Sequence, residues 1–288
     1  MSTPHSGTTT TPAKRNLSEG HLKVSIVTMT DERLVGDSTI IVTMETGAVE
    51  AASGVVDRIR LSILPQPDDQ TCGPTCLHAV YGYYGLKLPL SKVVAEISQL
   101  EGGGTVAVTL GNHALRNGFH ATIFTYNLQV FDPSWFASEV DLIEKLRSQA
   151  RHKTSRKLRR ITHEYLEFLE KGGKIRFEDL TESLIEGILS SGHPILTGLS
   201  ATYLYSCARE LGADYDDVRG EPMGHFVVLS SYDARTRRVW IADPLHPNPM
   251  AVPSQQYEID VRRVISSILL GTLTYDANLL LIEPREGL

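Results

Sequence analysis

Hydrophobic and polar positions follow two different periods along this chain of 288 residues. The runs Leu22–Met29 and Ser38–Met44 are rich in Val, Ile and Thr and are separated by turn residues, which predicts a β-hairpin. A further extended run, Val55–Leu64, stops at Pro65. From Cys72 onward apolar residues recur at helical spacing, so the short loop before Cys72 leads directly into the N-terminus of a helix.

Beyond this first helix the pattern predicts more helices and a late group of strands. Further helices are expected over Leu90–Leu100, Val106–Arg116, Phe177–Ser190, Thr202–Leu211 and Val261–Leu269. Strands are expected over His120–Tyr126, Pro194–Leu199, His225–Tyr232, Arg238–Ala242 and Asn278–Glu283. We therefore predict an α+β fold, in which a helical layer that begins at Cys72 packs on an antiparallel sheet.

The same patterns divide the chain into parts. Residues 1–20 are too polar to bury a core and are expected to form a disordered tail. Residues 21–60 form an N-terminal β segment in this interpretation, and residues 61–288 form the main domain. A charged, helix-favouring insertion is expected at about residues 138–171 within that domain.

Composition excludes several classes of function. A formal net charge of -6 argues against general nucleic-acid binding, because phosphate contacts need a basic surface. The three cysteines, Cys72, Cys76 and Cys207, match neither a metal site nor a disulfide framework, so we expect a reducing, cytoplasmic setting. No stretch approaches the ~20 apolar residues of a membrane span, and no signal-peptide pattern is present, so no membrane contact is expected.

One stretch of the charged insertion is strongly basic. Residues 145–160 contain eight Lys and Arg residues and no acidic residue: Lys145, Arg147, Arg151, Lys153, Arg156, Lys157, Arg159 and Arg160. A solvated helix face explains this pattern without any function, whereas the functional interpretation is a contact surface for an acidic partner or substrate. Spacing alone does not separate the two.

Cys72 has the surroundings that a thiol nucleophile requires. Its place in the first turn of a helix exposes it to unpaired N–H groups and to the positive end of the helix dipole, which stabilise a thiolate. Gly73 lets backbone or substrate come close, and Pro74 fits a first turn, where its missing N–H costs nothing. The backbone N–H of Cys72 and the side-chain amide of Gln66 can then form an oxyanion hole.

A base for this thiol is predicted in the late strands. His225 opens one predicted strand and Asp243 follows the next. If the turn between the strands centres on Ala234, an unbulged antiparallel register sets His225 directly opposite Asp243, on the same face. The carboxylate would then hold the imidazole in the tautomer that takes a proton from Cys72. We expect Cys72, His225 and Asp243 to form a catalytic triad.

Two sequence blocks resemble a known family. Gln-x5-Cys-Gly-Pro, from Gln66, and Gly-His-Phe-Val-Val with a later Ala-Asp-Pro resemble the bacteriocin-processing peptidases, the double-glycine leader peptidases or family C thirty-nine. The resemblance covers about residues 60 to 285 and suggests a stand-alone member without a fused transporter. It implies a papain-like cysteine peptidase that cleaves a peptide or isopeptide bond of a peptide or protein substrate. It also implies Cys72 as nucleophile, Gln66 as oxyanion donor, His225 as general base and acid, and Asp243 as the orienting residue, with no cofactor or metal.

Two alternatives stay open at the level of sequence. Phytochelatin-synthase-like transpeptidases share the Gln-x5-Cys-Gly and Gly-His-Phe blocks, so an acyl transfer to a second substrate competes with hydrolysis. A catalytically silent peptide-binding module is the other alternative, although the complete set of four residues weighs against it. Cys76 and Cys207 are interpreted as structural cysteines, with Cys207 inside a helix.

Overall fold

The computed structural model describes residues 25–28, 40–43, 59–100, 104–137, 140–212, 214–251, 254–274 and 277–285. The chain divides into two compact units, residues 1–54 and 55–288. In the first unit, β1 (Ser25–Thr28) and β2 (Ile40–Thr43) pair antiparallel. The turn expected between these strands and the tail expected over residues 1–20 lie outside the described residues.

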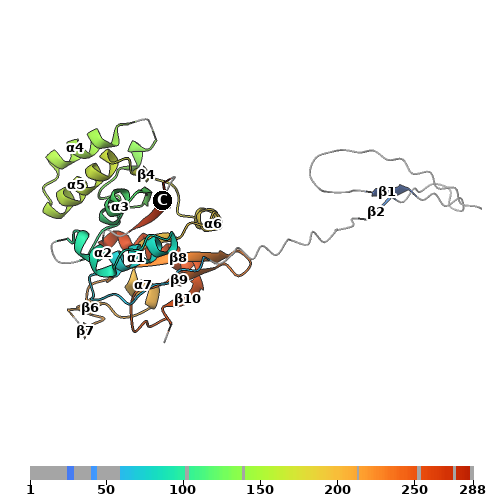
Figure 1. Cartoon of the computed structure of the whole chain (residues 1–288). Coiled ribbons are helices and arrows are strands. Elements are labelled where there is room, and N and C mark those ends of the chain that lie inside the picture. Colours follow the sequence, from blue (N-terminus) through green and yellow to red (C-terminus); the bar gives the residue numbers. More distant parts are fainter. Residues whose placement is uncertain are drawn as a thin grey trace, which may run out of the picture. The chain divides into compact units, whose positions relative to one another are not determined.

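A seven-stranded sheet forms the centre of the second unit, in the order β10-β9-β8-β5-β11-β3-β4 (Figure 1). All neighbouring strands are antiparallel except β3 and β4, which are parallel. The strands are β3 (Phe119–Thr125), β4 (Lys174–Arg176), β5 (Ile195–Ser200), β8 (Gly224–Asp233), β9 (Arg238–Ala242), β10 (Gln256–Asp260) and β11 (Asn278–Pro284). A separate small hairpin joins β6 (Glu210–Leu211) to β7 (Asp214–Tyr215).

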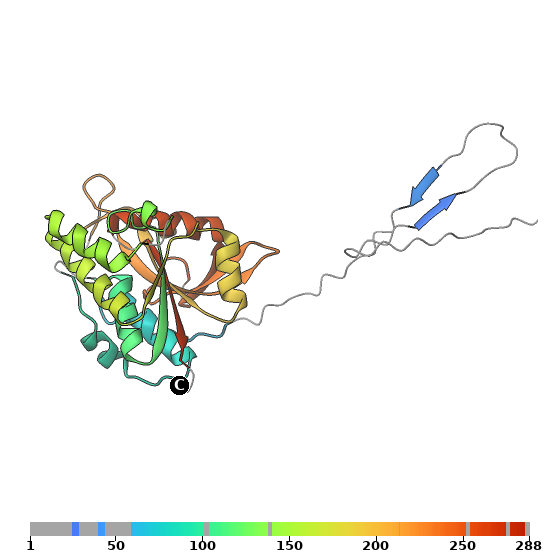
Figure 2. The same cartoon turned by 90° about the horizontal axis from the view of Figure 1, so that it is seen from above.

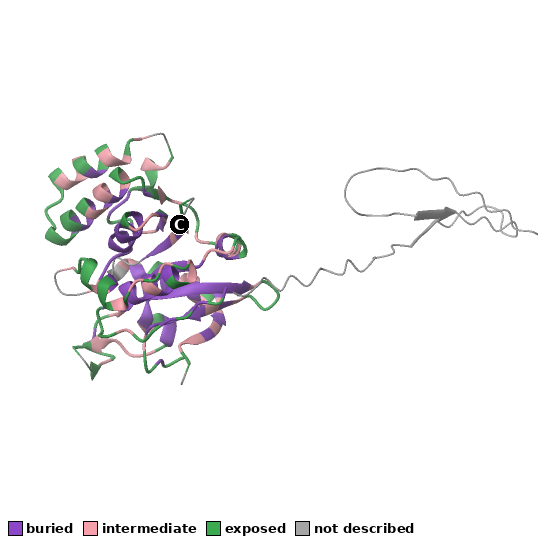
Figure 3. Cartoon of the chain, viewed as in Figure 1, coloured by how far each residue is buried: buried purple, intermediate pink, exposed green. Residues whose placement is uncertain are grey.

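Helices cover both faces of the sheet. The helices are α1 (Cys72–Tyr83), α2 (Leu90–Glu96), α3 (Ala107–Arg116), α4 (Leu142–His152), α5 (Arg156–Glu170), α6 (Glu182–Ser190), α7 (Ala201–Tyr205) and α8 (Val261–Leu270). Two 3-10 turns are η1 (Pro133–Trp135) and η2 (Gly271–Thr274). Figure 2 shows α1 and α8 on opposite faces of the sheet. Because both faces are covered, every residue of β5 is buried, as is most of β8 (Figure 3).

The predicted α+β fold is confirmed, with local differences. The helix expected over Thr202–Leu211 ends at Tyr205, because Ser206 adopts a left-handed conformation with φ of 54°. Cys207 therefore lies outside any helix, contrary to the sequence interpretation. The helix expected from Phe177 begins only at Glu182, where the Thr181 hydroxyl accepts a hydrogen bond from a backbone N–H.

The charged segment forms two helices, α4 and α5. Helix α5 packs against α3, and α4 packs against α5. The inward face of α5 repeats at helical spacing through Leu158, Ile161, Tyr165 and Phe168, all of them buried. Its basic residues occupy the other face. Within the described ranges, no helix is long and apolar enough to cross a membrane.

Candidate active site

Cys72 is the first residue of α1 and is 7% exposed. Thr71 precedes it, but the Thr71 hydroxyl makes no capping bond to this helix and contacts the loop residue Asp68 instead. No acidic side chain lies in the first turn. The partial positive charge of the N–H groups at this end is therefore not neutralised by a side chain of the helix, and it can stabilise a thiolate or a developing oxyanion.

Gln66 lies on a loop that the structure holds in place. Its backbone N–H donates to the carbonyl of Pro244, 2.9 Å away, which ties the loop to the residue after Asp243. Its side-chain Nε2 donates to the carbonyl of Asp68 at 2.9 Å, while its Oε1 is buried without a partner among the described residues. The Asp68 carboxylate in turn accepts from the backbone N–H of Gln70. The loop that carries Gln66 is thus held beside the residues that follow β9, and Asp243 is the first of them.

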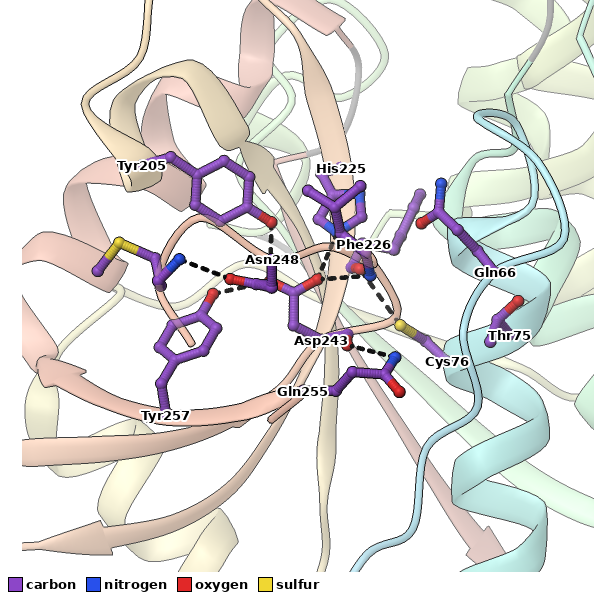
Figure 4. Close-up of polar contacts among 12 residues, drawn as sticks. Gln66, Thr75, Cys76, Tyr205, His225, Phe226, Asp243, Asn248, Gln255 and Tyr257 are labelled. Atoms are coloured by element: carbon purple, nitrogen blue, oxygen red, sulfur yellow. Dashed lines mark hydrogen bonds and ion pairs between the residues drawn. The ribbon is translucent and has the colours of Figure 1, made fainter. Parts of the chain in front are cut away.

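His225 and Asp243 are in direct contact. His225 Nε2 lies 2.9 Å from Asp243 Oδ1, with His225 6% exposed and Asp243 fully buried (Figure 4). Because Nε2 is engaged by Asp243, Nδ1 is the ring nitrogen left for another partner. The Cys72 thiol is one of the groups that raise the pKa of this ring.

The register between β8 and β9 differs from the prediction. The last pair before the turn is Asp233 with Arg238, so the turn does not centre on Ala234, and a bulge follows between Leu229 and Ser231. Beyond the bulge, Val228 pairs with Ala242. The unbulged register that would set His225 directly opposite Asp243 is therefore wrong.

The bulge nevertheless brings the two residues to one face. Because Val228 pairs with Ala242, the next step of the register places Asp243 opposite Val227. Side chains alternate between the two faces of a strand, so Val227 and His225, two positions apart, lie on the same face. Without the extra residue at Ser230, Asp243 would instead be level with Val228, which faces the other side. His225 and Asp243 thus meet as diagonal neighbours.

Asp243 also receives three further hydrogen bonds. The hydroxyl groups of Tyr205 and Tyr257 both donate to Oδ2, at 2.7 and 2.8 Å. The backbone N–H of Leu245 donates to Oδ1 at 3.0 Å. A fully buried carboxylate is costly unless its oxygens are satisfied, and both Asp243 oxygens are satisfied here.

These contacts shift the protonation of both groups. Burial lowers the pKa of His225, but the charge and hydrogen bond of Asp243, together with the Cys72 thiol, outweigh burial and raise this pKa to about 10. Burial raises the pKa of Asp243, but His225 and the hydrogen bonds from Tyr205 and Leu245 hold it below its usual value. At neutral pH an imidazolium beside an ionised Asp243 is favoured, which is the partner that a thiolate needs.

Other candidate side chains have structural partners. Cys76 is fully buried, its thiol donates to the Phe226 carbonyl at 3.2 Å, and burial raises its pKa well above the usual value. His113 lies between the Tyr81 hydroxyl, 2.8 Å from Nδ1, and Glu96, 3.1 Å from Nε2. No group of three or more His, Cys, Asp or Glu side chains in the described part of the chain is arranged to hold a metal ion.

Comparisons with known proteins show the family of this chain. The family model described as "Peptidase_C39 like family" matches residues 58–262, most of the chain. The chain belongs to the Peptidase_C39-like family. It is therefore a papain-like cysteine peptidase, as the sequence blocks predicted. A search of curated proteins gives no match.

Solved structures with similar chains are distant in sequence. A double-glycine motif protease from an AMS/PCAT transporter, in complex with the leader peptide, is 14% identical, with 79% of this chain and 94% of that chain covered and a TM-score of 0.38. A putative C39-like peptidase from Bacillus anthracis is 15% identical, with 80% and 96% covered and a TM-score of 0.42. The peptidase domain of Streptococcus ComA, a bifunctional ABC transporter, is 12% identical, with 79% and 99% covered and a TM-score of 0.36.

Tyr205 and Tyr257 also belong to the site of this C39-like peptidase, although no motif in the sequence marks them. Tyr257 pairs across β10 and β9 with Ile241, two positions before Asp243 and on the same face, so knowledge of that pairing would have located it. Tyr205 ends a five-residue helix whose end the sequence pattern placed six residues too late. Its position depends on tertiary packing, which residue periodicity does not report.

Proposed function

We propose that this C39-like peptidase cleaves a peptide or isopeptide bond with Cys72 as nucleophile, His225 as general base and acid, and Asp243 as the orienting residue. The observation that carries the proposal is the buried hydrogen bond of 2.9 Å from His225 Nε2 to Asp243 Oδ1, beside the N-terminus of the helix that holds Cys72. Family membership supports a peptide as the substrate.

The reaction follows from the placement of these groups. The Cys72 thiolate attacks the carbonyl carbon, a C–S bond forms, and the carbonyl oxygen becomes an oxyanion. The C–N bond then breaks while the His225 imidazolium gives its proton to the leaving amine. Water attacks the resulting thioester as His225 takes one of its protons, and the C–S bond breaks to release the acid.

Two donors are available for the oxyanion. One is the backbone N–H of Cys72, which no side chain caps. The other is Gln66 Nε2, which carries two N–H groups and uses one of them on the Asp68 carbonyl. The second N–H can donate to the oxyanion, and loss of such a donor typically costs about 10²–10³ in kcat.

Alkylation of the native chain tests the activated thiol without any knowledge of the substrate. The chain is treated with iodoacetamide at mildly acidic pH, and the modified cysteines are mapped by mass spectrometry. We expect Cys72 to react faster than the half-buried Cys207, and His225→Ala to abolish this preference. Equal labelling of both thiols, or labelling of Cys72 only after unfolding, would refute the proposal.

Product analysis then separates hydrolysis from acyl transfer. A peptide library is incubated with the chain, with Cys72→Ser as the control, in the presence and absence of an added amine or thiol acceptor. Hydrolysis yields a free carboxylate in both samples. A conjugated product that requires the acceptor would show that the chain is a transpeptidase.

An acidic partner at residues 145–160 is a separate proposal. Part of the basic stretch is already engaged within the chain, since Arg147 pairs with Glu170 at 2.8 Å and Arg160 donates to the Gln99 carbonyl at 2.7 Å. Lys145, Arg151 and Lys153 are exposed on α4 and just beyond its end. Binding of a glutamate-rich peptide that weakens with salt and with Lys145→Glu plus Arg151→Glu would support the proposal; no binding would reject it.

A further inference from the structure

Two tyrosine hydroxyl groups converge on one oxygen of Asp243. Tyr205 comes from the end of α7 and Tyr257 from β10, on two sides of the carboxylate (Figure 4). Both donate to Oδ2, at 2.7 and 2.8 Å. Their side chains are 8% and 6% exposed, so water has little access to these bonds.

The two oxygens of Asp243 therefore have separate sets of donors. Oδ1 accepts from His225 Nε2 and from the backbone N–H of Leu245, while Oδ2 accepts only from the two phenols among the described residues. Rotation of the carboxylate would break both phenol bonds at once. The pair thus fixes the oxygen that His225 contacts, and it fixes the orientation of the imidazole through that oxygen.

We propose that Tyr205 and Tyr257 are positioning residues of the C39-like active site, whose hydroxyl groups keep Asp243 ionised and aimed at His225. This inference rests on the proposed function, because it assigns the two tyrosines to the triad of Cys72, His225 and Asp243. It adds a pair of residues that neither sequence block contains.

The direction of the electrostatic effect follows from the hydrogen-bond donors. A phenol that donates to a carboxylate stabilises the ionised form and not the protonated form. The phenols themselves stay protonated, because burial and the charge of Asp243 raise the pKa of both Tyr205 and Tyr257. Loss of either hydroxyl group should therefore let Asp243 take up a proton at a higher pH, which removes the charge that supports the His225 imidazolium.

Tyr232 provides a matched control. It is 7% exposed, like the pair, and lies on β8, the strand that carries His225. Its hydroxyl group donates to Glu182 instead, at 3.3 Å. A Tyr→Phe change at this position removes the same atom from an equally buried ring without removing a bond to Asp243.

The test is the pH dependence of Cys72 alkylation by iodoacetamide in the full chain. Cys207→Ser serves as the background, so that Cys72 is the accessible thiol, and Tyr205→Phe, Tyr257→Phe, the double variant and Tyr232→Phe are compared between pH 4 and 9. The rate of Cys72 alkylation falls on the acidic side of its pH profile, and the midpoint of this fall is the quantity compared. We expect Tyr205→Phe and Tyr257→Phe each to raise this acid-side midpoint by about one pH unit, so that alkylation below the midpoint is about ten-fold slower. The double variant should move it further, and Tyr232→Phe should not move it.

Two results would overturn the inference. In the first, Tyr205→Phe and Tyr257→Phe have the same acid-side midpoint as Tyr232→Phe. In the second, Tyr232→Phe shifts the midpoint by as much as the two site variants do. Urea unfolding of each variant separates general destabilisation from a shifted midpoint, and the single variants decide the question if the double variant does not fold. Failure of the proposed function has a different signature, in which Cys72 shows no enhanced alkylation at acidic pH in the background chain itself.

Discussion

Gly73 follows the nucleophile, and its replacement by alanine tests how tightly α1 is placed. A Cβ atom at Gly73 would lie 2.3 Å from Thr105 Oγ1, whereas real Cβ contacts essentially never fall below 3.0 Å. Either the Thr105 hydroxyl group or the backbone at Gly73 or Thr105 must therefore move by at least 0.7 Å, the difference between these distances. Thr105 is buried and its hydroxyl group sits on a short side chain, so the movement falls on the backbone or on the Thr105 rotamer.

The expected effect is a loss of stability together with a loss of thiol activation. Overpacking of this kind lowers the free energy of unfolding by about 1–3 kcal/mol, whereas the higher helix propensity of alanine raises it by about 0.5–1 kcal/mol. Gly82 on the same helix is the matched control, because a Cβ there meets nothing within 4 Å and only the favourable helix effect applies. Urea unfolding should thus show Gly73→Ala destabilised and Gly82→Ala slightly stabilised, about 2 kcal/mol apart.

Removal of the clashing atom should restore the site. Thr105→Ala takes away Oγ1 and leaves contacts of 3.2 Å with Leu110 and 3.3 Å with Phe226, which small shifts can absorb. We expect Gly73→Ala to slow Cys72 alkylation at acidic pH by about ten-fold or more, since misplacement by 1 Å can cost about 10²-fold in an active site. Gly73→Ala with Thr105→Ala should recover most of both losses. A neutral Gly73→Ala, or a double variant whose losses simply add, would refute the reasoning.

Three further predictions concern the same domain. Native alkylation should modify Cys72 and Cys207 but not Cys76, whose fully buried thiol should react only after unfolding; modification of Cys76 in the native chain would contradict its placement. Because the pKa of His225 is raised to about 10, its contribution to the free energy of unfolding is complete below about pH 6.5 and is lost as pH rises toward about 10. Asp243→Asn should therefore reduce the change of this free energy, measured by urea unfolding, between about pH 6.5 and about pH 10. The pKa of His113 is lowered, chiefly by burial, so its neutral form should favour folding above about pH 6.5, and His113→Phe should reduce the loss of stability on acidification without altering Cys72 alkylation.

The sequence predicted most of the architecture because its strongest signals are local. The apolar spacing after Cys72 and the proline at Pro74 define α1 correctly, and the alternation around Val239 defines β9. Helix ends were less predictable. The stop at Ser206 depends on a left-handed backbone conformation that a serine rarely adopts, and no glycine or proline marks it in the sequence.

The contact between His225 and Asp243 shows why a correct pair can follow from an incorrect register. The predicted pair depends on a turn centred at Ala234 and on an unbulged hairpin, and the structure contradicts both. The observed turn alone would place Asp243 on the face opposite His225. The bulge at Ser230 shifts the register by one residue and returns Asp243 to the face of His225. Asp243 therefore lies opposite Val227, two positions along the strand from His225. The two side chains are long enough to meet diagonally, with 2.9 Å between His225 Nε2 and Asp243 Oδ1. The face of a strand residue is thus a more robust prediction than its cross-strand partner, whereas the tyrosines that complete the site require the full arrangement of α7 and β10.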